Sequence, residues 1–354
     1  IMKDKSIPLL NRYYMTGGDI EFFTFPQQIE ILKALIPEAK EYEDKAVITR
    51  LYAIIANHLV ALEDMNHVEV YLDSAFQYKG QFNNNAISGL MHYIKGYYFH
   101  NKNDVNQAHE NYYEAAGYLK QLPSLPPLLS DLYYNLARIY VLWADEERLK
   151  ELIVEMKEVP YYNTSQYLMN YSVIADLYAV QAQKHNQALL LDSVIKYNRL
   201  AIDQYNVAAD KESAGVGHQL SQNYIGLIQA YIRKGDAQAA SENMQQLYKF
   251  VNTDKWLNTM QLHTIEGEYY TLTKEYHKAE EALNKAATLL SELKKEYEVD
   301  FYPYYIQIYE SLGKIYEQQG KYDKALDYER LVLKYSQRLY DKESTTIVND
   351  LRVQ

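Results

Sequence analysis

The histidines, which could bind a metal ion or transfer protons, lack the spacing that a metal site on a helix requires. They occupy positions 58, 67, 92, 100, 109, 185, 218, 263 and 277. No two of them lie four residues apart, so the usual pair of zinc ligands on one helical face is missing. His92 and His100 could share a face, but two imidazoles do not complete a zinc site. The sequence therefore predicts no bound metal.

Other catalytic groups are equally poorly placed. Gly215-Val216-Gly217 lacks the third glycine and the preceding strand of a dinucleotide-binding loop. Gly-x-Ser-x-Gly is absent, and zero cysteines exclude thiolate catalysis and disulfides. The carboxylate pairs Glu146-Glu147 and Glu280-Glu281 are typical of solvated helix faces. We predict that this chain is not an enzyme and carries no cofactor.

The charge balance also excludes whole classes of partner. The chain has 36 basic and 47 acidic residues, a net charge of −11, and no basic cluster with interleaved aromatic residues. Such a surface repels phosphate backbones, so we expect no direct binding of nucleic acid. No apolar run approaches the roughly 20 residues that cross a bilayer, so we expect no insertion into a membrane. The lack of cysteine fits an oxidising or a reducing compartment equally well.

One stretch near the C-terminus shows how the chain is organised. Tyr309, Leu312, Gly313 and Tyr316 fall on one helical face, with a glycine where another backbone must come close. A glycine at 320 ends that helix, and Tyr322 and Ala325 begin the apolar face of a second helix, with Ala325 facing Gly313. The pattern predicts a helical hairpin.

The same hairpin pattern recurs upstream, with a small or aliphatic residue marking the register of each first helix. The register residues are Ala56, Gly96, Ala137, Ala175, Ile228, Gly267 and Gly313. This repeat resembles the tetratricopeptide repeat, over residues 49 to 335. The resemblance implies an all-α fold, a right-handed superhelix of about seven hairpins. The steps of 38 to 53 residues exceed the family's ~34, so we expect longer helices and an insertion that includes residues 210–217.

These registers predict the following organisation. Residues 1–48 form an N-terminal helical cap, and residues 336–354 form an exit helix that begins a coiled coil. The hairpins between them span approximately 49–88, 89–129, 130–167, 168–220, 221–259, 260–305 and 306–335.

The resemblance also implies where a ligand would bind. In a tetratricopeptide superhelix the first helices line the concave face, so residues one and five after the leading aromatic should point into the groove. The candidate binding residues are Asn57, Tyr93, Tyr97, His100, Tyr134, Asn135, Arg138, Asp176, Gln229, Arg233 and Glu268. The tyrosines offer flat amphipathic contact surface, and Arg138 and Asp176 offer charge partners for a peptide. In the last hairpin, Gln307 and Lys314 contribute to a polar inner face.

The C-terminal residues suggest a connection to something further. Tyr340, Ser344, Ile347, Leu351 and Gln354 alternate four and three apart, the spacing of a heptad seam that would support a homodimer. The run Tyr340-Asp341-Lys342-Glu343-Ser344, following a tyrosine-rich helical array, resembles the extracytoplasmic sensor region of bacterial membrane-spanning regulators. The absence of a methionine before Ile1 fits removal of an upstream segment such as a secretory signal.

Three functional hypotheses follow. The first is a periplasmic or extracytoplasmic sensor module of a bacterial signal-transduction or transcriptional regulator, including two-component systems. It would bind a peptide, protein or envelope-derived ligand and transmit a change through residues 336–354. The second is a cytoplasmic regulator that responds to peptides, resembling the tetratricopeptide receptors of quorum sensing. The third is a passive scaffold for protein assembly.

Overall fold

A computed structural model describes residues 24–62, 64–102, 104–124, 126–161, 163–209, 216–251, 256–297 and 302–353. For residues 256, 295–297 and 340–353 we consider the backbone alone. Every regular element within these ranges is a helix, which confirms the predicted all-α class. None of the described helices is both long enough and apolar enough to cross a membrane.

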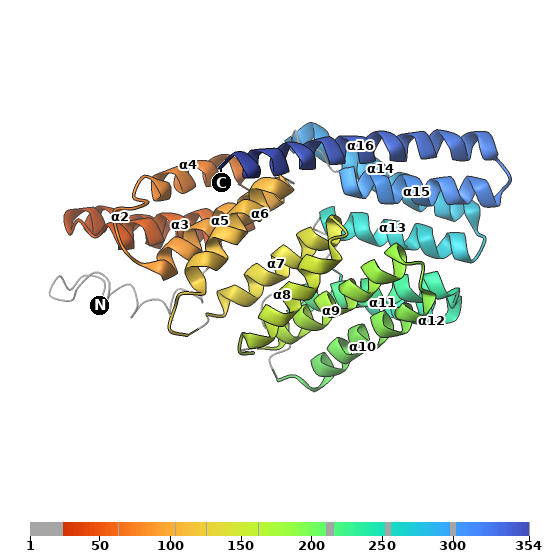
Figure 1. Cartoon of the computed structure of the whole chain (residues 1–354), viewed down its shortest axis with the longest axis horizontal. Helices are drawn as coiled ribbons and strands as arrows, with labels where there is room; N and C mark the ends of the chain where they lie inside the picture. Colours follow the sequence, from red (N-terminus) through yellow and green to blue (C-terminus); the bar gives the residue numbers. More distant parts are fainter. Residues whose placement is uncertain are drawn as a thin grey trace. The chain divides into compact units, whose positions relative to one another are not determined.

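The chain divides into two compact units, residues 1–132 and 133–354, which we describe separately (Figure 1). The helices of the first unit are α2 (Phe25–Glu41), α3 (Lys45–Ala61), α4 (Met65–Phe76), α5 (Asn85–Asn101) and α6 (Val105–Leu119). In this unit α3 packs on α4 and α5 packs on α6, while α3 and α5 also touch each other. The core contains Leu51, Ile55 and Ile94, each at most 1% exposed. This is the expected arrangement of stacked hairpins.

The second unit continues the pattern from α7 (Leu128–Leu142), whose first residues still belong to the first unit. Its other helices are α8 (Glu146–Glu158), α9 (Thr164–Lys184), α10 (Leu191–Val207), α11 (Val216–Lys234), α12 (Ala237–Leu247), α13 (Trp256–Leu272), α14 (Tyr276–Tyr297), α15 (Tyr302–Gln318) and α16 (Tyr322–Val353), with a short 3-10 turn at Ala188–Leu190. Consecutive helices pair as α9 with α10, α11 with α12, α13 with α14 and α15 with α16. The first helices also touch in sequence, α9 to α11 to α13 to α15.

Several turns inside the hairpins have a residue in the left-handed conformation. Gly320 and Gly235 have φ of 68° and 78°, the left-handed conformation that ends a helix without steric cost. The predicted stop at Gly320 is therefore confirmed. Ala144 takes the same conformation with a side chain, and the following Asp145 accepts a hydrogen bond from the backbone N–H of Arg148. In the turns after α7 and α11, the first helix is thus ended and the second helix capped within a few residues.

Two glycines permit the close contact between the helices of a hairpin. A Cβ at Gly96 would lie 2.6 Å from the ring of Tyr112, and a Cβ at Gly267 would lie 2.4 Å from Leu283. At Gly313 the nearest atoms, Tyr328 Cβ at 3.7 Å and the Ala325 carbonyl oxygen at 3.9 Å, leave ordinary van der Waals distance. The hairpin with the clearest sequence pattern is therefore packed less tightly at its glycine than two of its weaker copies.

Some sequence predictions fall partly outside the described residues. Within the predicted cap 1–48, residues 1–23 are outside, and α2 and the start of α3 are inside. Of the predicted insertion 210–217, residues 210–215 are outside, while Val216 and the residue after it already belong to α11. The backbone of α16 is helical to Val353, but the predicted seam residues from Tyr340 onward have side chains outside the described part.

Candidate functional site

Arg138 is the centre of a polar cluster in the second unit. It lies on α7, directly after the register residue Ala137, and is half-buried. Its Nη1 donates a hydrogen bond to Oε1 of Gln222 on α11 at 3.3 Å. Burial alone would lower the pKa of Arg138, but Tyr134, Tyr304 and Asp176 outweigh it and raise the pKa. The guanidinium therefore stays charged on the inner side of the unit.

Asp176 faces the same space from α9, again one residue after the register position. It is half-buried, and burial raises its pKa from 3.8 to about 6 although the charge of Arg138 acts in the opposite direction. Among the described side chains it accepts no hydrogen bond and makes no ion pair. A carboxylate in this state is poorly solvated and keeps its acceptor capacity unused.

Amide side chains link this cluster to later helices. Gln222 Nε2 donates to Gln261 Oε1 on α13 at 3.2 Å, and Gln219 Nε2 donates to the hydroxyl of Tyr134 at 3.1 Å. The first helices of hairpins far apart in sequence thus meet through their inner faces. Since each glutamine has both donors and an acceptor, the network can exchange partners with a bound chain.

A second acidic group lies further along the same layer. Glu268 on α13 accepts a hydrogen bond from Gln307 Nε2 on α15 at 3.1 Å. Burial raises the pKa of Glu268, while that hydrogen bond, the charges of Arg233 and Lys314, and Gln229 act in the opposite direction. Polar side chains of helices α7, α9, α11, α13 and α15 therefore interact through hydrogen bonds or charge. We define the polar inner face as Tyr134, Arg138, Asp176, Gln219, Gln222, Gln261, Glu268, Tyr304 and Gln307.

The structure groups the sequence-predicted residues into two sets. Arg138 lies near Tyr134 and Asp176, and Glu268 lies near Gln229 and Arg233, all in the second unit. Their role in binding stays a prediction. The half-buried Asn135 is adjacent in sequence to Tyr134 on α7.

The remaining predicted residues belong to the first unit. Tyr93 and Tyr97 on α5 stack nearly parallel, with ring centroids 6.4 Å apart, and Tyr93 also contacts the fully buried Tyr112. The hydroxyl of Tyr112 lies 3.5 Å from Nδ1 of His100. Asn57 is half-buried on α3. The rings of Tyr93, Tyr97 and Tyr112 therefore contribute to the packing of α5 on α6 at least as much as they offer a surface for a ligand.

The sequence prediction missed four members of the polar inner face and recognised Gln307 only as part of a polar surface. Three of these glutamines lie seven residues before the residue that follows the register position of their helix. The pairs are Gln222 with Gln229, Gln261 with Glu268 and Gln307 with Lys314. Because seven residues make about two helical turns, both members of each pair lie on the same helical face. That spacing is a usable signal. Gln219 and Tyr304 lie a further turn toward the N-terminus, and the fold brings Gln219 to Tyr134 and Tyr304 to Arg138.

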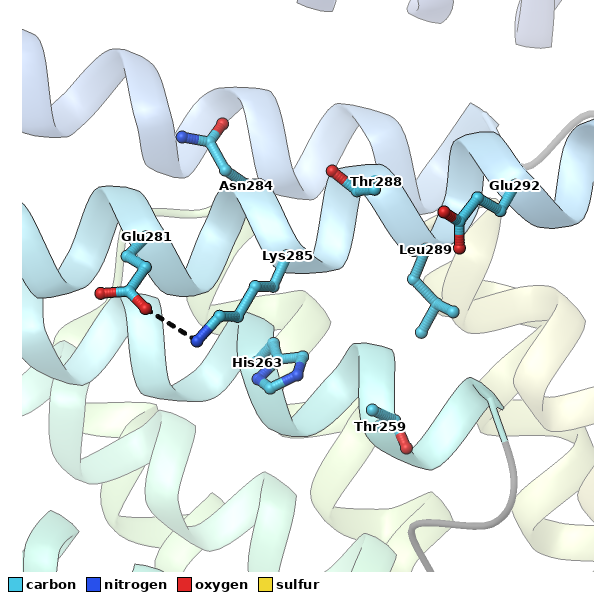
Figure 2. A pocket seen from close by; sticks show the side chains of 8 residues that line it. All are labelled: Thr259, His263, Glu281, Asn284, Lys285, Thr288, Leu289 and Glu292. Carbon is cyan, nitrogen blue, oxygen red and sulfur yellow. Dashed lines mark hydrogen bonds and ion pairs between the residues drawn. The ribbon is translucent and has the colours of Figure 1, made fainter.

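A surface hollow of about 530 Å³ lies between α13 and α14 (Figure 2). Three of its lining residues are already paired, Lys285 with Glu281 at 2.8 Å and His263 with the neighbouring Glu266 at 3.0 Å. Among the described residues no group of three or more His, Cys, Asp or Glu side chains is placed to hold a metal ion. The polar inner face, with its unused acceptor at Asp176, is the stronger candidate for a binding site.

Comparison by sequence finds no matching family model and no matching curated protein. Comparison by structure finds the apo form of RapI, with a TM-score of 0.60, 8% identity, and coverage of 83% of this chain and 99% of RapI. A Rap protein complexed with Competence and Sporulation Factor has a TM-score of 0.58 at 12% identity, covering 94% and 98%. The Rap conjugation gene regulator of the plasmid pLS20, in complex with the Phr* peptide, has a TM-score of 0.51 at 12% identity, covering 94% and 95%. At these identities the likeness concerns the fold.

Proposed function

We propose that this chain, a tetratricopeptide-like helical repeat protein, is a regulator that binds a short peptide on the polar inner face of residues 133–354. The observation that carries the proposal is the convergence of Arg138, Asp176 and the linked glutamines from separate hairpins. Each is half-buried or buried, and several have hydrogen-bonding capacity left over. An extended peptide offers a carbonyl and an N–H at every residue, which is what such a surface can accept.

The comparisons support the second of the three sequence hypotheses better than the first. A similar solved structure holds the Phr* peptide, and we transfer that kind of ligand to this chain as a proposal. The envelope sensor and its periplasmic location receive no support from the similar structures. A passive scaffold would have no use for a half-buried carboxylate without a hydrogen-bond donor, because such a group reduces stability. We therefore place the function in ligand-dependent regulation and not in catalysis.

A peptide-retention experiment tests this function. Pools of random-sequence peptides of five to eight residues are equilibrated with the purified chain, and the retained peptides are identified by mass spectrometry. We expect a sequence-selective subset to be retained, and Arg138→Ala to weaken its binding by about 10- to 100-fold, since a charged hydrogen-bond donor is lost. Arg148→Ala, on the exposed side of α8, is the matched control and should retain the subset. If the unaltered chain retains nothing, the proposed function is wrong.

A separate observation favours self-association through α16. Leu326 and Leu333 are 46% and 69% exposed on this helix and lie seven residues apart. In the sequence the same interval continues to Tyr340 and Ile347, which extends the heptad seam toward the N-terminus. We propose a weak homodimer in which this seam is the contact.

The dimer prediction is tested by light scattering across a range of concentrations. Leu333→Glu should shift the chain toward the monomer, because a charge in the seam must be desolvated on association. Leu189→Glu, which alters a still more exposed leucine (85%) of the α9–α10 connection, should leave the mass distribution unchanged. A chain that is monomeric at every concentration would refute the seam.

A further inference from the structure

The imidazole of His92 on α5 is buried in the first unit, with only 4% of the residue exposed. Its ring stacks on that of Tyr118 on α6, with the ring centroids 5.7 Å apart. It also meets the ring of Phe76, the last residue of α4, edge-on at 5.1 Å. Side chains of three successive helices, α4, α5 and α6, are therefore in contact at this one titratable ring.

The neighbours of His92 fix which of its ring nitrogens carries a proton. Nδ2 of Asn111 donates to the backbone carbonyl of Gln107 at 2.8 Å, so Oδ1 of Asn111 is the atom that faces Nδ1 of His92, at 3.3 Å. A carboxamide oxygen only accepts hydrogen bonds, so Nδ1 carries the proton of the neutral ring. Nε2 then bears a lone pair, and it has no hydrogen-bond partner in the described part of the chain.

A second proton, on Nε2, would be poorly accommodated. Oε2 of Glu114 lies 3.9 Å from Nε2, beyond hydrogen-bond distance, on a side chain that is 55% exposed. The ammonium groups of Lys95 and Lys79 lie 4.4 and 5.9 Å from the centre of the Phe76 ring that borders His92. An imidazolium here would be desolvated, with two cations nearby and one largely solvated anion, so the packed state disfavours it.

We propose that His92 is a pH-sensitive lock in the first unit, which holds α4, α5 and α6 together while its ring is neutral and opens their packing when Nε2 takes up a proton. The second unit stays folded when the lock opens. This inference goes beyond the proposed peptide binding, since it concerns residues of the first unit and needs no ligand.

The direction of the pH effect agrees with this geometry. Burial lowers the pKa of His92 from 6.5 to about 4. The charges of Lys79 and Lys95 add to this effect, while the charge of Glu114 and the hydrogen bond with Asn111 oppose it. The packed state thus binds the proton less tightly than an open state in which the ring is solvated. The packing is fully stable above pH 6.5 and loses stability as the pH falls from there toward 4.

Hydrogen exchange of the full chain, measured by mass spectrometry at pH 7.5 and 5.5, tests the lock. Labelling times are scaled to the intrinsic exchange rate at each pH, so the remaining difference reflects opening of the structure. In the wild type, acidification should reduce the protection of α5 and α6 by about 10-fold more than in His92→Gln. The glutamine can still donate to Asn111 but takes up no proton. Peptides from α13 and α14 should respond to pH equally in both proteins.

Two further variants complete the comparison. His67→Gln alters an imidazole on α4 that is 68% exposed, and it should keep the pH response of the wild type. His92→Phe, which preserves a ring and takes up no proton, replaces His92→Gln if the glutamine disturbs the packing. If α5 and α6 of the variant at position 92 lose protection in acid as the wild type does, the lock is refuted.

Nuclear magnetic resonance of the wild type gives a readout that does not depend on any variant folding. With ¹⁵N-labelled histidine, the ring of His92 in the folded chain should stay neutral and protonated on Nδ1 at both pH 7.5 and pH 5.5. A proton on Nε2 of the neutral ring, or a ring that becomes charged in this range while α5 and α6 remain protected, would overturn the proposal.

Discussion

Gly96→Ala is expected to lower the free energy of unfolding by about 2 kcal/mol. The added methyl would lie 2.6 Å from the ring of Tyr112, and that ring is fully buried and also packed against Tyr93. A rigid aromatic ring in a dense core cannot move by several tenths of an ångström without displacing its neighbours. The overlap therefore outweighs the roughly 1 kcal/mol that alanine gains over glycine in helix propensity.

The hairpin that contains Gly96 offers a matched control. Gly117 lies on α6, and a Cβ there would meet nothing within 4 Å. Gly117→Ala should therefore raise the free energy of unfolding by about 0.5–1 kcal/mol. Urea denaturation followed by circular dichroism at 222 nm compares the two variants. Equal effects of the two substitutions would contradict the close contact between α5 and α6.

Asp176→Asn is expected to stabilise the protein by about 3 kcal/mol at pH 7.5. Burial raises the pKa of Asp176 from 3.8 to about 6, and each unit of displacement corresponds to about 1.4 kcal/mol. Since the folded state binds this proton more tightly than the unfolded state, ionisation of Asp176 destabilises the fold. The Asp176 carboxylate also accepts no hydrogen bond among the described residues, so replacing it by the amide of asparagine breaks no hydrogen bond.

The difference in stability between the variant and the wild type should depend on pH. Above pH 6 the folded wild-type chain carries the ionised carboxylate and bears the full cost, so the variant should be more stable. Between pH 6 and about 4 the wild type takes up the proton when folded, and the advantage of the variant should shrink to nothing. Comparing the urea midpoints of the two proteins at pH 7.5, 5 and 4 isolates Asp176, because other groups, including the half-buried Asp131, are shared. A constant difference across this range would rule out the raised pKa.

A stabilising substitution at Asp176 would also bear on function. Residues that reduce stability are retained where they serve a site, and the same Asp176→Asn change should weaken peptide binding because the neutral amide accepts a weaker hydrogen bond. Opposite effects on stability and on binding would distinguish a ligand-binding carboxylate from a merely tolerated one.

Several features could be read from the sequence because they depend on contacts between near neighbours. Tyr309, Leu312, Gly313 and Tyr316 predict one helical face from spacing alone, and Gly320 predicts the stop that its φ of 68° confirms. The same periodicity predicts that the residue after each register position faces the groove, and this rule selects Arg138 and Asp176. Helical period, glycine stops and charge balance are local or additive properties, so they require no knowledge of how the hairpins stack.

The stacking of the hairpins decided the rest. Gln219 contacts Tyr134, which lies 85 positions away in the sequence, and Arg138 lies near Tyr304 from the last hairpin. The helical period predicts contacts only between residues a few turns apart, so it cannot predict these two. The tightness of packing at Gly96 and Gly267, and its looseness at Gly313, depend on where the facing side chains lie. The state of Asp176 is likewise a property of the fold, because the cost of burying a charge depends on the solvent that surrounding helices exclude.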